Sequence, residues 1–387
     1  MSERVARIRV ASPRRDASGA VLLEGDLAVP GREIPRITFA FTHGGREPAL
    51  PLLRPFLLAY LPVAMRLGLP IATDRPLDDE THRNLMTWQA AWAAWRPGRL
   101  SAVPVLAPRG GVGRGEDASP RGHLSAFSGG VDSCFTVWRQ AHAPDSSPVL
   151  PIRGCLFVRG FDVPHADRVA GERAHERARK ILDSFGIPLY SLATDVRVLE
   201  RACDLDWETE THGIWLGAAL ACLESSYEGV VVPSTFTYDC LRLPWGSNPI
   251  GDPLLGSDRV PFRHDGAECT KLDKVTAMAA DPAIARGVRV CYHAPSRDEN
   301  CGHCYKCITT QVSFWLAGVP APCAFPEPCT PADLASMPIE FEQHDFLVAQ
   351  IVQRALEAGR DDIARPLSRA RRRWRRRRRR RARRERG

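Results

Sequence analysis

HLSAFSGGVDS, at residues 123–133, contains the most specific motif of the sequence. Its first five residues suit a buried strand, the next six form the string SGGVDS (128–133), and a helical pattern begins near Cys134. Small residues at such a junction let the backbone approach a ligand, and the N–H groups at the start of a helix attract an anion. The stretch therefore predicts a phosphate-binding loop, with a serine-capped strand-to-helix turn as the simpler alternative.

Strand-like and helical segments alternate beyond this loop. The strand-like runs are HLSAF (123–127), GCLFV (154–158), PLYSL (188–192) and GVVVPS (229–234). Helical patterns cover residues 131–142, 166–185 and 208–226. Strands separated by helices of this length favour right-handed crossovers and a parallel sheet with helices on both faces. The predicted fold class is α/β, with a doubly wound parallel sheet.

The flanking regions follow other patterns. Short apolar runs between residues 7 and 41 indicate strands, whereas residues 52–67 and 82–95 have helical spacing. The chain is thus expected to contain an N-terminal α+β region (1–107), a Gly- and Pro-rich linker (108–122), a main domain (123–320), a C-terminal helical extension (321–368) and an Arg-rich tail (369–387).

Charge is distributed unevenly along the chain. The segment 369–387 has fourteen arginines and one glutamate, a net charge of +13, so that the rest of the chain carries −5 of the total of +8. A block of like charges with little to bury is expected to be disordered. It could contact RNA phosphates or be an extension without a function.

The sequence also bears on compartment and membrane association. No run approaches the roughly 18 apolar residues that cross a bilayer, and the N-terminus lacks the apolar core of a secretory signal. We therefore expect a cytoplasmic protein with no membrane partner. Its 12 cysteines are then expected to be reduced thiols or metal ligands.

Four cysteines, Cys291, Cys301, Cys304 and Cys307, are spaced C-x9-C-x2-C-x2-C. Two thiolates separated by two residues can bind one tetrahedral ion, and Gly302 relieves crowding in the knuckle between them. Four thiolates close the coordination shell, which favours a structural zinc ion over a catalytic one. An iron–sulfur cluster is the main alternative, and free buried cysteines are the simplest one.

The SGGVDS loop together with the CG-x-C-x-x-C knuckle resembles the PP-loop ATP pyrophosphatases of the N type, and within them the 7-cyano-7-deazaguanine synthase-like proteins. The likeness extends over roughly residues 123–318, and the segments 210–213, 269–275 and 290–292 also look similar. It implies an adenine nucleotide alpha hydrolase-like fold and the cofactors ATP, Mg²⁺ and structural Zn²⁺.

The resemblance also implies roles for individual residues. It assigns the pyrophosphate part of ATP to Ser128, Gly129, Gly130, Val131 and Ser133, and Mg²⁺ to Asp132. Lys271 and Lys274, three apart on one helix, are candidate cations for the phosphates, with surface lysines as the alternative. Asp162 follows the second strand at the sheet edge where open α/β sheets bind ligands, although an ordinary loop aspartate would look the same.

The acceptor region departs from the family pattern. Arg159-Gly160-Phe161-Asp162 stands where the family has Tyr-Gly-Gln, and the family's deazaguanine-recognising stretch has no clear equivalent. The resemblance therefore implies a ligase or synthase that adenylates a different small-molecule or peptide acceptor, releasing pyrophosphate and then AMP. An RNA-modifying enzyme and a non-catalytic zinc-stabilised module are the alternatives. His264, in a predicted loop, is a weaker candidate for a general base.

Overall fold

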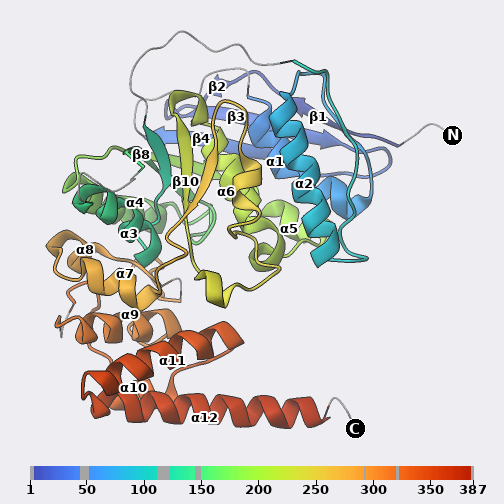
Figure 1. The fold of residues 1–387 in the computed structure, drawn as a ribbon. Coiled ribbons are helices and arrows are strands. Elements are labelled where there is room, and N and C mark those ends of the chain that lie inside the picture. The colour runs from blue at the N-terminus through green and yellow to red at the C-terminus, as the bar shows by residue number, and fades with distance from the viewer. Residues whose placement is uncertain are drawn as a thin grey trace.

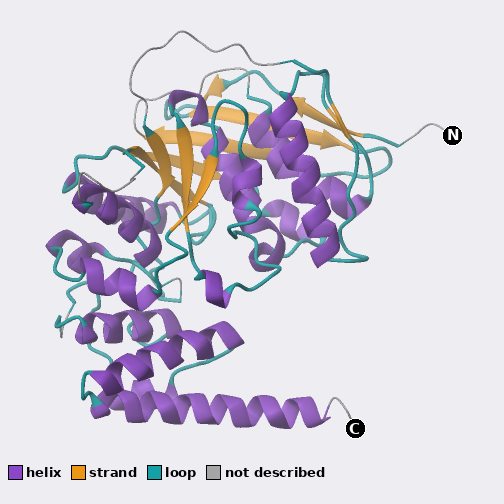
Figure 2. Ribbon diagram, in the orientation of Figure 1, coloured by secondary structure: helices purple, strands orange, loops and turns teal. Residues whose placement is uncertain are grey.

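The computed structural model describes residues 4–43, 52–110, 122–143, 150–291, 293–319 and 322–384. Its centre is a mixed 11-stranded sheet in the order β11-β10-β7-β8-β9-β4-β3-β1-β5-β6, with β2 paired to β3 (Figures 1 and 2). The strands are β1 (Ala6–Val10), β2 (Arg14–Arg15), β3 (Val21–Ala28), β4 (Ile37–His43), β5 (Ile71–Ala72), β6 (Val105–Leu106), β7 (His123–Ala126), β8 (Ile152–Arg159), β9 (Leu189–Thr194), β10 (Gly229–Pro233) and β11 (Phe262–Asp265).

The five strands β11, β10, β7, β8 and β9 are mutually parallel. The four strands predicted from the sequence coincide with β7 to β10, which confirms the α/β class for this half of the chain. The chain runs outward from β7 through β8 to β9 and then crosses back to β10 on the other side of β7, so the strand order reverses at β7. Such a switch point opens a crevice at the carboxyl ends of the strands, where open α/β sheets bind ligands.

The N-terminal strands extend the same sheet. Strand β4 pairs antiparallel with β9, and Phe39 lies opposite Thr194 in the register. The predicted parallel sheet is therefore one part of a larger mixed sheet, which strands of the N-terminal region (1–107) extend. An unpaired β9 would leave a row of backbone groups exposed at a sheet edge, and β4 satisfies them. Residues 111–121 of the predicted linker lie outside the described part. Arg109, which precedes them, forms an isolated parallel β-bridge with Leu77.

Helices cover both faces of the sheet. On one face lie α1 (Arg54–Leu67), α2 (Asp79–Trp95) and α6 (His212–Ala221), and on the other α3 (Val131–His142) and α4 (Arg168–Asp183). Strand residues alternate between these two cores, as the twofold repeat of a strand requires. Val230 and Val232 of β10 pack with the first group of helices, and Val231 packs with the second.

The remaining helical elements include the C-terminal helices α7 to α12, which gather on one side of the sheet (Figure 1). They are α5 (Val198–Cys203), the π-turn η1 (Trp207–Thr211), the 3-10 turns η2 (Glu224–Ser226), η3 (Tyr238–Cys240) and η4 (Asp252–Leu255), and α7 (Lys271–Met278), α8 (Pro282–Gly287), α9 (Tyr305–Leu316), α10 (Pro331–Ser336), α11 (Glu342–Glu357) and α12 (Asp361–Arg384). No described helix is both long enough and apolar enough to cross a bilayer.

The Arg-rich tail is helical as far as Arg384, contrary to the expected disorder of residues 369–387. Its helix α12 packs on α10 and α11 in a small apolar core that also includes part of α9. Carboxylates on α11 neutralise part of the arginine charge, and Asp345 accepts hydrogen bonds from both Arg371 and Arg375. Repulsion between like charges is therefore offset by groups that lie elsewhere in the sequence.

Candidate functional site

The SGGVDS loop forms the junction between β7 and α3. Gly129 has a φ of 74°, which a residue with a Cβ adopts only with strain. Gly130 occupies the N-cap position, where no side chain caps the helix. The Gly130 N–H donates to Ser128 Oγ at 3.3 Å, and Ser133 Oγ donates to the Gly130 carbonyl at 3.1 Å. The amides of the first helical turn are thus left without a side-chain acceptor.

A cavity of about 540 Å³ opens at this junction. Its walls come from the loops after β7, β8 and β10 and from α7, α9 and α11. Ser128, Gly130, Val131 and Asp132 line it, so four of the six loop residues face the space that a ligand would occupy. Gly129 and Ser133, also predicted phosphate contacts, are not lining residues; Ser133 is buried and its hydroxyl turns back into the loop.

Two lysines from α7 meet the Asp132 carboxylate. Lys274 Nζ lies 3.0 Å from Oδ1, and Lys271 Nζ lies 3.2 Å from Oδ2. Lys274 is 2% exposed and also donates to the Ser234 carbonyl at 2.7 Å. Burial works to raise the pKa of Asp132, but the two ammonium groups outweigh it and lower that pKa. Burial lowers the pKa of Lys271, and Asp132 opposes that change. Asp132, Lys271 and Lys274, which we call the trio, together carry one net positive charge next to the loop.

Arg289 is a cationic residue of the site that sequence reasoning missed. Its side chain is almost fully buried, and its Nη1 donates to the carbonyls of Cys291 and Arg297 at 3.1 and 3.2 Å. The backbone N–H of Arg289 donates to the Gly129 carbonyl at 2.8 Å, which joins the segment after α8 to the loop. Asp162 lines the cavity as predicted from its position, and its carboxylate lies 3.7 Å from Arg289 Nη2.

The cavity carries an excess of positive charge. Asp132, Asp162 and Glu208 are its acidic lining residues. The lysines and arginines that line it are Arg197, Arg242, Lys271, Arg289, Arg297 and Lys306. Six cationic groups against three carboxylates favour an anionic ligand.

Aromatic side chains form another wall of the cavity. Trp207, at the start of the π-turn, lies with its ring centroid 4.9 Å from Phe161 and 5.8 Å from His212. Burial lowers the pKa of His212, which therefore is neutral. Its Nδ1 donates to the Trp207 carbonyl at 3.2 Å, while Nε2 accepts from the Ser247 N–H at 3.1 Å. These contacts fix the tautomer and leave the ring as a rigid wall.

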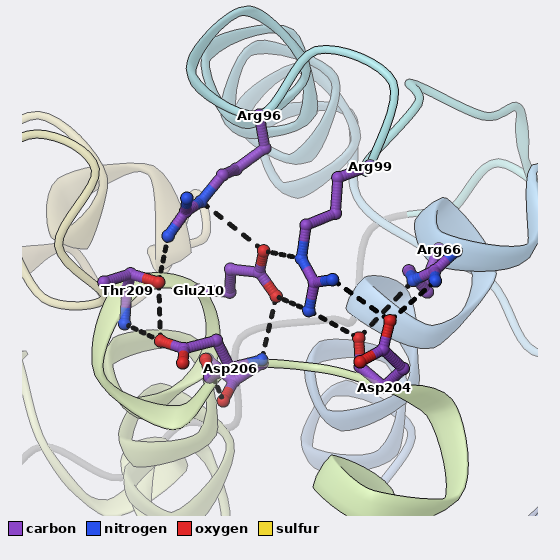
Figure 3. Close-up of polar contacts among 8 residues, drawn as sticks. Arg66, Arg96, Arg99, Asp204, Asp206, Thr209 and Glu210 are labelled. Carbon is purple, nitrogen blue, oxygen red and sulfur yellow. Dashed lines mark hydrogen bonds and ion pairs between the residues drawn. The ribbon is translucent and has the colours of Figure 1, made fainter. Parts of the chain in front are cut away.

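The N-terminal part of the chain holds the π-turn in place. The carboxylate of Glu210 is completely buried and accepts hydrogen bonds from Arg99 Nε at 2.5 Å and from Arg99 Nη2 at 3.2 Å. Arg96 Nε lies 3.4 Å from the same carboxylate (Figure 3). The Asp206 N–H donates to Glu210 at 2.8 Å, and Asp206 Oδ1 in turn accepts from the Thr209 amide at 2.7 Å. Arg96 and Arg99, at the end of α2, thereby position the π-turn whose residues line the cavity. Such π-helical turns are frequent at functional sites.

The C-terminal extension supplies another wall. His344 of α11 stacks on Tyr305 of α9, with ring centroids 3.6 Å apart. Burial lowers the pKa of His344 to about 3, and the nearby Lys306, Lys271 and Arg242 act in the same direction. The imidazole is therefore an uncharged, stacked surface of the cavity.

The four predicted cysteine ligands converge beside this cavity. Their Sγ atoms all lie within 4.8 Å of one another, with Cys301 and Cys307 3.8 Å apart and Cys291 and Cys304 also 3.8 Å apart. A tetrahedral ion with bonds of about 2.3 Å to sulfur would place its ligands roughly 3.8 Å apart. The cluster could therefore hold a single metal ion. A four-iron cluster would separate the sulfurs further, because each thiolate binds a different iron.

The backbone around the cysteines has the features of a metal knuckle. The amides of His293 and Cys304 donate to the sulfurs of Cys291 and Cys301 at 3.2 and 3.3 Å. Gly302 has a φ of 80°, as the tight turn between the ligands requires. Hydrogen bonds from Cys304 and Cys307 hold the pKa of Cys291 well below its usual range.

Asn300 and Cys291 connect this cluster to the cavity. The buried Asn300 side chain accepts from the amides of Val290 and Cys291 and donates to the carbonyls of Val288 and Ala324. Cys291 itself lines the cavity. A metal ion at the cluster would thus fix the wall that carries Arg289.

His264 does not belong to the site. It lies in β11 rather than in the predicted loop, and its Nδ1 is 2.7 Å from Asp252 Oδ2 in a buried pair. Neither residue lines the cavity.

Comparison with known proteins adds no functional assignment: no protein-family model matches the chain, and neither does any curated protein or solved structure.

Proposed function

We propose that the chain is an ATP-dependent enzyme of the PP-loop ATP pyrophosphatase type, which transfers AMP to an oxygen of a carboxylate, amide or similar acceptor. The acceptor oxygen would bond to the α-phosphorus, and the bond from that phosphorus to the α,β-bridging oxygen would break, with pyrophosphate leaving with the electron pair. A nitrogen or sulfur nucleophile would then displace AMP. The observation that carries the proposal is the uncapped start of α3 beside the Asp132 and lysine trio.

Each part of the loop has a role in this proposal. Ser128 and the amides at the start of α3 would bind the leaving pyrophosphate, because helix N-termini favour anions. Lys271 and Lys274 would neutralise charge that develops on it, and Arg289 would act from the opposite side. The aromatic wall around Trp207 would contact the planar or apolar part of a ligand.

The metal ions have different places in the proposal. Both oxygens of Asp132 are engaged by lysines, which does not favour the Mg²⁺ role implied by the resemblance, so Mg²⁺ is assigned to no residue and would arrive with the nucleotide. The four cysteines would hold Zn²⁺ in a closed sulfur shell with no open position, which suits a structural role.

Calorimetric binding of MgATP, AMP and pyrophosphate tests the proposal. We expect MgATP and pyrophosphate to compete, and Lys271→Met, at the lysine that lines the cavity, to weaken both by about 10- to 150-fold, as loss of one charged hydrogen bond of about 1.5–3 kcal/mol would. Lys180→Met, at a lysine that is 70% exposed on α4, is the control and should bind normally. Equal affinity of Lys271→Met and wild type, or tight AMP binding without competition from pyrophosphate, would overturn the assignment.

A further inference from the structure

Helix α12 has two chemically different faces. Its apolar side, with Ile363, Leu367, Ala370 and Trp374, packs against α10 and α11. Beside this face, Asp345 pairs with two arginines and Glu342 pairs with Arg378, so acidic groups of α11 neutralise the arginines that lie nearest to it. The helix is therefore anchored by both burial and charge.

The opposite face carries arginines that these anchors leave unneutralised. Six exposed arginines have no ion pair with a described carboxylate: Arg369, Arg372, Arg376, Arg377, Arg379 and Arg380. At 3.6 residues per turn they occupy an arc of about 160°, in which Arg372, Arg376 and Arg379 lie roughly opposite the apolar side and Arg377 lies nearest to it, and they extend for about 16 Å along the axis. We call these six residues the arginine stripe.

We propose that the arginine stripe binds the phosphate backbone of single-stranded RNA. Guanidinium groups present paired N–H donors that match phosphate oxygens, and arginine keeps its charge at any physiological pH. The stripe consists of arginines alone, without the asparagine, glutamine or acidic side chains that would distinguish the other bases, which points to contact with the backbone and not with a sequence.

Two other anionic partners fit the helix less well. A membrane-binding helix inserts its apolar face, but that face of α12 is covered by α10 and α11. A DNA duplex needs flanking backbone contacts from neighbouring elements, whereas α11 offers Glu342 and Asp345 and the chain before residue 369 carries −5. A flexible single strand can follow one row of arginines without approaching those carboxylates.

Fluorescence anisotropy with a 20-nucleotide single-stranded RNA tests the stripe in the full chain. Each phosphate contact on a single strand contributes about 0.7 to the slope of log affinity against log salt, so six contacts predict a slope of about −4. Replacing Arg372, Arg376 and Arg379 with glutamine should reduce that slope to about −2 and weaken binding roughly 100-fold at 0.1 M salt.

A control with the same change of charge separates the stripe from overall electrostatics. Arg173, Arg201 and Arg286 are exposed on α4, α5 and α8, and their replacement with glutamine should leave RNA binding within about twofold. Equal loss in both triple variants would overturn the proposal, as would tighter binding of duplex DNA or anionic vesicles than of RNA. Retained metal content and melting temperature in both variants would show that they fold. These results do not depend on the ATP cavity.

Discussion

Arg99 should stabilise the fold far more than Arg66, although both hold the same carboxylate. Each donates to Asp204, which is 71% exposed, but only Arg99 also reaches the fully buried Glu210 (Figure 3). Removing one partner of a buried ion pair costs about 3–5 kcal/mol. Because Arg96 remains 3.4 Å from Glu210 and the Asp206 amide still donates to it, the low end of that range applies.

Arg99→Met is therefore expected to lower the free energy of unfolding by about 3 kcal/mol, whereas Arg66→Met, which loses only an exposed pair, should lower it by at most about 1 kcal/mol. Methionine keeps most of the aliphatic stem, so the comparison isolates the charged group. Urea unfolding, followed by both tryptophan fluorescence and circular dichroism, measures the difference. Equal effects of the two substitutions would refute the idea that Glu210 depends on Arg99.

Three further predictions concern the loop, the cysteine cluster and the cavity wall. Gly129→Ala and Gly186→Ala, both at positive φ, should each cost roughly 1–2 kcal/mol of stability, but only the former should also weaken MgATP binding in calorimetry. Cys301→Ser should lose bound metal, measured by elemental analysis, and lower the melting temperature, while Cys323→Ser at an exposed thiol should do neither. The pKa of His344 is about 3 in the folded chain, and the reference value of 6.5 applies to the unfolded chain. Acidification therefore protonates this imidazole in the unfolded chain first. Wild type should therefore lose stability relative to His344→Phe as the pH falls from 6.5 to 3, and parallel pH profiles would contradict this.

Local patterns predicted the parallel half of the fold because the type of each element there follows from the pattern of a few consecutive residues. Alternating apolar strands and spaced helices located β7 to β10, α3 and α4, and the C-x9-C-x2-C-x2-C spacing located a cluster that could hold a metal. The spacing of Lys271 and Lys274 predicted one helix face that meets the phosphates; both lysines contact Asp132, and their role toward a phosphate stays a prediction.

The features that sequence reasoning missed depend on contacts between distant segments. The pairing of β4 with β9 depends on contact between two segments that lie far apart in the sequence, so no local pattern predicts it. The charge of α12 indicated disorder because its neutralising Asp345 lies on another helix. Arg289 looks like an ordinary arginine until the fold buries it beside Gly129, and Glu210 gains its role only when α2 brings Arg99 to it.

The proposed function depends on the loop at residues 128–133 as a cradle for the phosphates of a nucleotide. A crystal structure of the chain with a non-hydrolysable α,β-methylene analogue of ATP tests it most directly. The β- and γ-phosphates are expected at the amides of Gly130, Val131 and Asp132, within reach of Lys271 and Lys274. A nucleotide bound elsewhere, or a cavity that stays without ligand at saturating concentration, would contradict the account.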